Sequence, residues 1–395
     1  MQIDEFDSKW LTRFRRALRK WYAANARDLP WRRTNDPYRI WISEIMVQQT
    51  TVAAGVPYFE RWFERFPDVV SLSAAPLDEV LKYWEGLGYY SRARNIHKTA
   101  SLIVVDYDGE FPNDVSRLNA LPGIGRYTAG AVCSFAFDKP AAIVEANTLR
   151  LYCRLMGFDG EPRSTAGQKK LWEFAEHIVP SRSPGAFNQG LMELGSTTCR
   201  SAEPDCKNCP VKSCCRALAN NQVSSIPRPE TRPQITPVTE VSVAIRRGRG
   251  NKSTYLLRLR RDGERWAGLW DFIRFEIDNA VAESVVFGKT AKSKNANPKS
   301  LFTGDDSLKQ LVEREVHSRT GLTIDCGSAI REINHSVTRY RIRLLCFDAR
   351  RRSGRLFEDQ TFRWVSPLEF DDYPLSVTGR KLAVSLIQKQ SPPHG

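Results

Sequence analysis

The hydrophobic period of the chain changes at a proline-rich stretch, residues 222–237, and this change constrains the fold more than any other feature. Before the stretch, apolar residues recur at spacings of three and four, as on one face of a helix. Beyond it they alternate with polar neighbours, as in half-buried strands; examples are Val241, Val243 and Ile245. We therefore predict an all-α domain over residues 1–221, an extended linker over residues 222–237 and an α+β domain over residues 238–390.

Within the second half, helical spacing from Leu308 to Val316 predicts a helix that ends before Gly321. A second alternating run predicts another strand, made of Tyr340, Ile342, Leu344 and Cys346. The polar residues 289–306 predict a surface loop.

Composition narrows the partner. The chain carries 59 Lys and Arg and 45 acidic residues, which gives a net charge of +14. This charge favours a polyanionic binding partner. Nucleic acid is the first candidate, and an anionic membrane surface is the second. Because no run of about 18 apolar residues exists and the first five residues are acidic, we expect no membrane partner. We expect an intracellular, cytoplasmic and nucleoid-associated monomer. Nine cysteines, an odd number, favour a metal site in a reducing compartment over disulfides.

Four of these cysteines crowd into residues 199–215, separated by six, two and five residues: Cys199, Cys206, Cys209 and Cys215. Four thiolates suit either tetrahedral zinc or an iron-sulfur cluster, and the spacing leaves both open. Cys214 is expected to point elsewhere.

Residues 121–132 predict a tight turn that starts a helix. Gly123 and Gly125 permit a sharp backbone turn, and a helix ending near Asn119 would complete a helix-hairpin-helix. Its N-H groups, with Arg126 next to them, would suit a phosphate oxygen. The alternative is an ordinary glycine-rich connection between two helices.

Two glutamates have contrasting surroundings. Glu44 lies in an apolar stripe on a helix predicted from Pro37 to about Val52, so its pKa should rise; the alternative is an exposed or salt-bridged side chain. Glu145 precedes a helical run whose positive end should keep it ionised, or it only caps that helix. One neutral and one ionised carboxyl suit cleavage of a glycosidic bond through a cationic sugar.

Together, four motifs resemble the MutY family of adenine DNA glycosylases: the hairpin, the cysteine spacing, the segment Trp41-Ile-Ser-Glu-Ile-Met-Val-Gln-Gln-Thr50 and the run Gly86-Leu-Gly-Tyr-Tyr-Ser-Arg-Ala-Arg-Asn95. The resemblance implies an enzyme of base excision repair that binds double-stranded DNA and removes adenine mispaired with 8-oxoguanine or guanine. It also implies that the cysteines hold a 4Fe-4S cluster.

The resemblance assigns Glu44 as the acid that protonates adenine, with Tyr127 beside it. Glu145 falls on the family's catalytic aspartate, one methylene longer, and Asn147 follows it. The endonuclease III branch has a lysine where this chain has Tyr127, and a phenol cannot form an imine, which implies a monofunctional enzyme. The alternatives are a bifunctional glycosylase/lyase and a non-catalytic, zinc-containing DNA-binding protein.

Further DNA contacts also follow from the resemblance: Gln49 and Tyr89 entering the base stack, Gly123, Gly125 and Arg126 on phosphate, and Arg27 and Gln189 near the adenine pocket. The second domain resembles a Nudix-like domain. Ser318 and Arg319 stand where metal-binding glutamates would be, so pyrophosphate hydrolysis is not expected. Thr338 keeps a hydroxyl in the loop that would recognise the oxidised base; the alternative is a plain strand turn.

Overall fold

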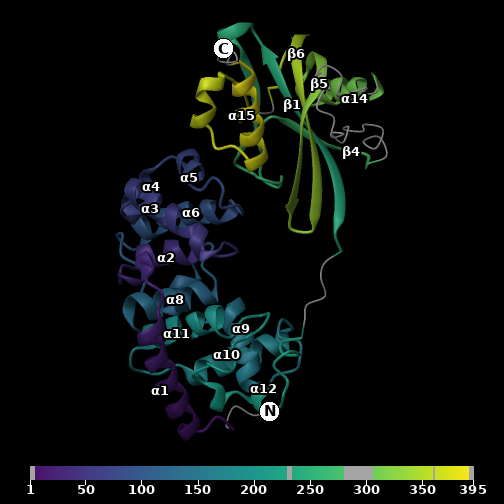
Figure 1. Cartoon of the computed structure of the whole chain (residues 1–395). Helices are drawn as coiled ribbons and strands as arrows, with labels where there is room; N and C mark the ends of the chain where they lie inside the picture. Colours follow the sequence, from purple (N-terminus) through teal and green to yellow (C-terminus); the bar gives the residue numbers. More distant parts are fainter. Residues whose placement is uncertain (1–4, 229–233, 280–305, 359–360, 391–395) are drawn as a thin grey trace, which may run out of the picture. The chain divides into compact units, whose positions relative to one another are not determined.

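The computed structural model describes residues 5–228, 234–279, 306–358 and 361–390 (Figure 1). The chain divides into two compact units, one made of Met1–Ala75 and Arg92–Thr231 and the other of Pro76–Ser91 and Arg232–Gly395. The division near residue 231 falls inside the predicted linker. The inclusion of residues 76–91 in the second unit is not foreseen by the sequence.

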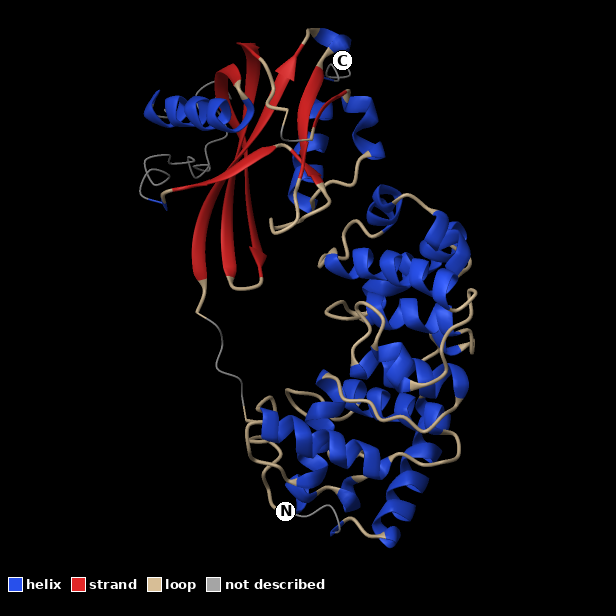
Figure 2. Ribbon diagram, turned by 180° about the vertical axis from the view of Figure 1, so that it is seen from behind, coloured by secondary structure: helices blue, strands red, loops and turns tan. Residues whose placement is uncertain are grey.

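The first unit is helical, as predicted (Figure 2). Its elements are α1 (Ser8–Asn25), η2 (Pro30–Arg32), α2 (Pro37–Met46), α3 (Val52–Arg65), α4 (Val69–Ala74), α6 (Ser91–Asp106), α7 (Val115–Asn119), α8 (Arg126–Phe137), α9 (Ala146–Met156), α10 (Thr165–Ile178), α11 (Pro184–Thr197), η3 (Lys212–Cys214) and α12 (Arg216–Ala219). Aromatic side chains from α1, α9, α10 and α11 fill one core, among them Phe14, Tyr152, Phe174 and Phe187.

Asp36 caps α2, and Pro37 opens it, as predicted. The predicted end near Val52 is wrong, because α2 ends at Met46. Gln49 has a left-handed backbone with φ of 58°, which no helix can continue, and Thr51 caps the next helix.

The second unit is α+β, as predicted. Besides α5 (Leu77–Tyr83), its elements are β1 (Thr236–Arg247), η4 (Gly250–Lys252), β2 (Thr254–Leu259), β3 (Trp270–Asp271), β4 (Ile273–Ile277), α14 (Asp306–Thr320), β5 (Leu322–Val337), β6 (Tyr340–Gly354), β7 (Phe362–Val365), η5 (Pro367–Asp372) and α15 (Val377–Gln390).

Seven strands form one mixed sheet with the order β3-β2-β1-β6-β5, in which β4 also pairs with β1 and β7 with β2. The β1–β6 pair is parallel and the others are antiparallel. One apolar core joins the sheet to α14, and another joins its other face to α15 (Figure 1). Most of the polar segment 289–306 lies outside the described residues.

Two further predictions need correction. Strand β1 is buried on both faces rather than half-buried, since Glu240 and Ser242 between its apolar residues are also covered. The start of the predicted linker is not extended, because Ile226 is buried in the helical core and its carbonyl accepts a hydrogen bond from Arg154 at 2.9 Å.

None of the helices in the part of the chain that the structure describes has the length and hydropathy needed to cross a membrane.

Candidate active site and four-cysteine loop

Glu44 lies inside the helical unit, where α2 packs against α8. Its side chain is buried, with 4% of the residue exposed, so the exposed alternative is excluded. From α8, the Tyr127 hydroxyl donates a short hydrogen bond to Glu44 Oε2. The Tyr127 oxygen also lies 3.8 Å from Met192 Sδ on α11. The carboxyl is therefore fixed in position by one hydroxyl inside an otherwise apolar packing.

This burial changes the protonation of Glu44. Burial raises the pKa of Glu44 to about 7, and the charge of Glu145 adds to the rise, while the Tyr127 hydrogen bond opposes it. Burial also raises the pKa of Tyr127 well above its usual value, so the phenol keeps its proton and acts as the donor. The predicted upward shift of Glu44 is thus present, and the acid can hold a proton near neutral pH.

Glu145 is the N-cap of α9. Its two carboxyl oxygens accept hydrogen bonds from the backbone N-H groups of Asn147 and Thr148, each at 2.8 Å, and Thr148 Oγ1 accepts from the Glu145 N-H at 2.9 Å. Glu145 therefore caps α9. The predicted effect of the helix end is outweighed, because burial raises the pKa of Glu145 against these hydrogen bonds.

Close backbone packing brings Glu145 to this place. A Cβ on Gly130 of α8 would lie 2.2 Å from the Ala142 carbonyl oxygen, so the chain before Glu145 runs directly against the helix. Asn188 of α11 is fully buried and donates to the Ala141 carbonyl at 2.8 Å. The sequence analysis assigned no role to Gly130 or Asn188. The available signal for Gly130 was a glycine within an apolar helix, and Asn188 had none.

Asn147 is linked to the cysteine loop through one side chain. Arg150, one turn along α9, donates to Asn147 Oδ1 at 2.9 Å and to the Cys199 carbonyl at 2.8 Å. A Cβ on Gly195 would lie 2.9 Å from Asn147 Cβ. Sequence reasoning missed Arg150, whose spacing of three from Asn147 was the available signal.

The turn before α8 has the predicted form. Helix α7 ends at Asn119, Gly123 has a φ of 74°, and Gly125 caps α8. Gly125 needs no special backbone angle, and a Cβ there would meet nothing within 4 Å. Arg126 pairs with Glu176 at 2.5 Å and lies over the Trp172 ring, so any phosphate contact of this arginine would compete with Glu176.

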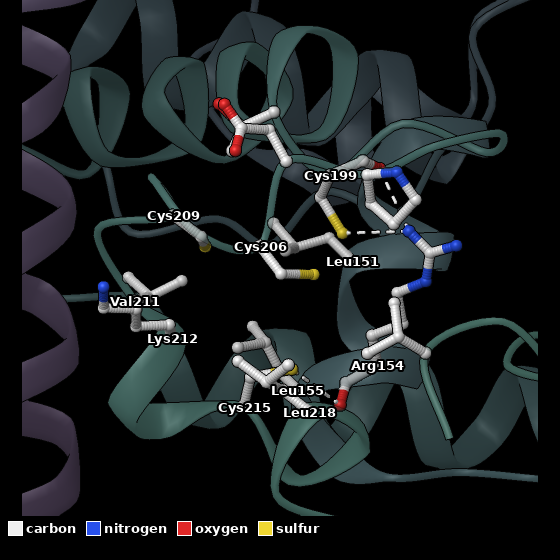
Figure 3. A pocket seen from close by; sticks show the side chains of 14 residues that line it. Leu151, Arg154, Leu155, Cys199, Cys206, Cys209, Val211, Lys212, Cys215 and Leu218 are labelled. Carbon is white, nitrogen blue, oxygen red and sulfur yellow. Dashed lines mark hydrogen bonds between the residues drawn. The ribbon is translucent and has the colours of Figure 1, made fainter. Parts of the chain in front are cut away.

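Cys199, Cys206, Cys209 and Cys215 line one pocket, together with apolar side chains such as Leu151 and Val211 (Figure 3). Cys214 does not line this pocket, as predicted. Arg154 reaches it from α9, with Nη1 at 3.3 Å from Cys199 Sγ.

Among the described residues, no three potential metal ligands stand in an arrangement that would hold an ion. The donor set nevertheless fits a thiolate-bound group. Burial raises the pKa of Cys209 to about 12, and the charges of the neighbouring cysteines add to this rise, so a cation among the sulfurs would be strongly favoured over four bare thiolates.

Arg27 and Gln189 have protein partners. Arg27 donates to Glu193 Oε1 at 2.6 Å, and Gln189 accepts from the Tyr22 hydroxyl at 2.7 Å. Glu193, fully buried, also pairs with Arg32 at 2.8 Å. The sequence analysis missed Glu193, because nothing local marks a buried glutamate whose partners lie far away along the chain.

The other predicted DNA contacts share an unusual backbone. Gln49, Tyr89 and Thr338 all have left-handed φ angles, of 58°, 46° and 51°. Non-glycine residues adopt this conformation at an energetic cost, and such residues concentrate at functional sites. Tyr89 is half exposed, and Thr338 is exposed in the turn between β5 and β6.

Comparison with known proteins gives consistent matches. Residues 42–177 match the family described as HhH-GPD superfamily base excision DNA repair protein. The chain is 37% identical over 264 residues to the adenine DNA glycosylase of Buchnera aphidicola subsp. Acyrthosiphon pisum, covering 67% of this chain and 74% of that protein. To the adenine DNA glycosylase of Mus musculus it is 42% identical over 233 residues, 56% of this chain and 45% of the mouse protein. The match thus spans less than half the length of the mouse protein.

Two solved structures are also similar to parts of the chain. A thermostable thymine-DNA glycosylase matches at a TM-score of 0.50 and 31% identity, covering 54% of this chain and 98% of that chain. A MutT protein from Methanosarcina mazei Go1 matches 40% of this chain and 98% of its own at 18% identity and a TM-score of 0.28.

Proposed function

The chain belongs to the adenine DNA glycosylase family, and we propose that it hydrolyses the N-glycosidic bond of adenine mispaired with 8-oxoguanine or guanine in duplex DNA. The observation that carries the proposal is a pair of carboxyls, one buried with a pKa of about 7 and one fixed at a helix N-terminus. This pair matches what departure of a base through a cationic sugar requires.

In the proposed reaction, Glu44 donates its proton to the adenine ring and so converts the base into a neutral leaving group. Tyr127 orients the carboxyl through its hydrogen bond. Glu145, whose oxygens both accept backbone N-H bonds, is a fixed negative charge that stabilises the sugar cation. Water then attacks the sugar and leaves an abasic site.

The absence of a lysine at the Tyr127 position supports a monofunctional enzyme. A bifunctional enzyme needs an amine that attacks the sugar and forms an imine, and the buried phenol of Tyr127 cannot form one. We expect borohydride to trap no covalent complex with DNA; a trapped adduct would contradict this assignment.

For the cofactor, the four cysteines around one pocket support a 4Fe-4S cluster held by Cys199, Cys206, Cys209 and Cys215. Such a cluster would supply structural order to the loop that follows α11, and Arg154 beside Cys199 would offset its negative charge. Purified protein should be brown. A colourless protein that contains zinc would contradict this cofactor.

DNA is the proposed partner. The turn at Gly123 and Gly125 would accept a phosphate, and the open space at Gly125 supports this placement. The left-handed residues Gln49, Tyr89 and Thr338 support their roles at the lesion, because strain of this kind accompanies functional sites. Thr338 would bond the oxidised base.

The test is single-turnover release of adenine from duplexes with adenine opposite 8-oxoguanine. A duplex with adenine opposite thymine is the negative control. Glu44→Gln should lower the rate by about 100-fold or more, as expected for loss of a general acid. Glu64→Gln, an exposed glutamate on α3, is the matched control and should keep the rate. A Glu44→Gln enzyme with the rate of the wild type would refute the mechanism.

Glu145 provides a second comparison. Glu145→Gln keeps the length of the side chain and removes its charge, so base release should fall by about 100-fold or more. Glu145→Asp keeps the charge and tests whether this site accepts the shorter arm.

A further inference from the structure

One end of the sheet in the second unit carries arginines that face one another. Strand β1 ends in Arg246 and Arg247, and the parallel strand β6 places Arg350 directly opposite Arg246. Arg351 follows on β6. Because successive side chains of a strand point to opposite faces, Arg246 and Arg350 lie on one face of the sheet, whereas Arg247 and Arg351 line a groove on the other. We call the pair Arg247 and Arg351 the arginine cluster.

Like charges in register oppose strand pairing. Arg247 donates to Thr254 Oγ1 at 3.0 Å, and Arg351 donates to the Gly354 carbonyl at 2.6 Å. Neither has an ion-pair partner among the described residues. The charge of Arg351 adds to burial in lowering the pKa of Arg247, which shows that the two guanidinium groups repel each other. The folded chain therefore keeps positive charge concentrated here at a cost.

Neighbouring arginines at this end of the sheet do have carboxylate partners. Arg352 pairs with Asp325, and Arg355 pairs with Glu358 at 2.7 Å. Arg350 also lies opposite a carboxylate, Asp325. Among the described residues, the two arginines of the cluster have no such partner, so they can bind an external anion.

An open groove lies next to the cluster. Arginines and aromatic residues line it, among them Arg247, Arg351, Phe357, Phe362 and Trp364, and so does the ion pair of Arg355 with Glu358. The Arg247 guanidinium lies over the Trp364 ring, 4.5 Å from its centre, which holds the charge in a fixed place. Fixed arginines beside an open groove suit the phosphate oxygens of a nucleic-acid backbone.

The cluster lies far from the turn that carries Thr338. Arg350 is ten residues beyond Tyr340 on β6, and a strand rises about 3.3 Å per residue, so the two ends are separated by about 33 Å. Duplex DNA advances about 3.4 Å per base pair. This separation equals the length of about 10 base pairs of a duplex that runs parallel to the strands.

We propose that the arginine cluster is a second DNA-binding surface, which holds the phosphate backbone of the duplex about one helical turn away from the lesion. This inference rests on the proposed function in one respect, namely that the Thr338 turn lies at the lesion. The second surface would add a phosphate contact that requires a sufficiently long duplex and does not depend on the chemistry of the damaged base.

The test compares two duplexes with a central lesion, one of about 15 and one of about 35 base pairs. The short duplex extends about 24 Å from its centre, too little to reach the cluster, whereas the long one extends about 58 Å. Binding is measured against salt concentration for the full chain carrying Glu44→Gln, so that the adenine stays in place. Arg247→Gln/Arg351→Gln should make the slope of log K against log salt shallower by about 1.8 on the long duplex, at about 0.9 per phosphate, and leave it unchanged on the short duplex.

Two controls accompany this variant. Arg314→Gln/Arg319→Gln removes the same charge from α14 and should leave both slopes unchanged. Arg247→Lys/Arg351→Lys keeps the charge and should restore most of the slope on the long duplex, which guards against misfolding.

Three outcomes would overturn the proposal: an unchanged slope on the long duplex, an equal change on the short duplex, or an equal change in the α14 control. Base release from the short duplex, measured with the glutamate at position 44 intact, tests the proposed function separately. An enzyme that releases no adenine but shows the length-dependent slope would refute that function and leave the second surface standing.

Discussion

Replacing Glu44 with glutamine should stabilise the folded chain at alkaline pH while it removes base release. The ordinary pKa of the carboxyl is 4.5, and burial raises the pKa of Glu44 to about 7. Between these values the folded chain holds a proton that the unfolded chain has released, so the free energy of unfolding falls as the pH rises. The free-energy cost of ionising the buried carboxyl is nearly absent below about pH 4.5 and reaches its full value above about pH 7.

The shift of 7 − 4.5 = 2.5 pKa units corresponds to about 3 kcal/mol at 1.36 kcal/mol per unit. Glutamine has the same length, can still accept from Tyr127 and never ionises, so it avoids this cost. Any change in packing alters the free energy of unfolding by the same amount at every pH. The informative quantity is therefore the difference between the stabilisation at about pH 8.5 and that at about pH 5, which should be about 2 to 3 kcal/mol.

Urea unfolding followed by circular dichroism at the two pH values measures this difference, with Glu64→Gln as the exposed control. The control should show no comparable dependence on pH. If Glu44→Gln changed the free energy of unfolding equally at both pH values, Glu44 would not be a buried carboxyl with a raised pKa, and the reasoning for its role as the acid would fail.

Two further predictions concern the same site. Tyr127→Phe removes the hydrogen bond that lowers the pKa of Glu44, so the alkaline limb of the pH profile of base release should move upward by about one unit; a limb that stays in place or moves downward contradicts this. Gly130→Ala would put a carbon 2.2 Å from the Ala142 carbonyl oxygen, and the melting temperature should fall by several degrees. Gly190→Ala, where the new carbon meets only side-chain atoms at 3.2 Å or more, should have a much smaller effect on the melting temperature.

The fold classes of the two halves were predictable because hydrophobic period is a local property. The environment of β1 was not, because its polar positions are neutralised by residues distant in sequence. Glu240 receives a hydrogen bond from Arg274 at 2.5 Å inside the sheet. Nothing near Glu240 distinguishes a paired, buried glutamate from a solvated one, so the alternation alone predicts a half-buried strand.

In the candidate site, too, local features were predictable from the sequence and long-range contacts were not. The apolar neighbours of Glu44 one turn away on the same helix indicated its burial, but an exposed or salt-bridged side chain stayed open until the fold was known. Asn188 and Glu193 on α11 act through partners at Ala141 and Arg27, which lie 47 and 166 residues away. Only the folded chain brings such pairs together, and a lone asparagine or glutamate in a helix carries no sign of them.

Glu145 shows why two interpretations of one residue need not compete. The sequence left open whether this glutamate caps a helix or takes part in catalysis, and the structure shows the cap. The two oxygens of this carboxylate each accept a backbone N-H bond, from Asn147 and from Thr148. Its charge is held in one place by the backbone, as electrostatic stabilisation of a cation requires. The cap is therefore the reason that Glu145 is proposed as a stabilising charge, because the backbone of α9 fixes the position of its two oxygens.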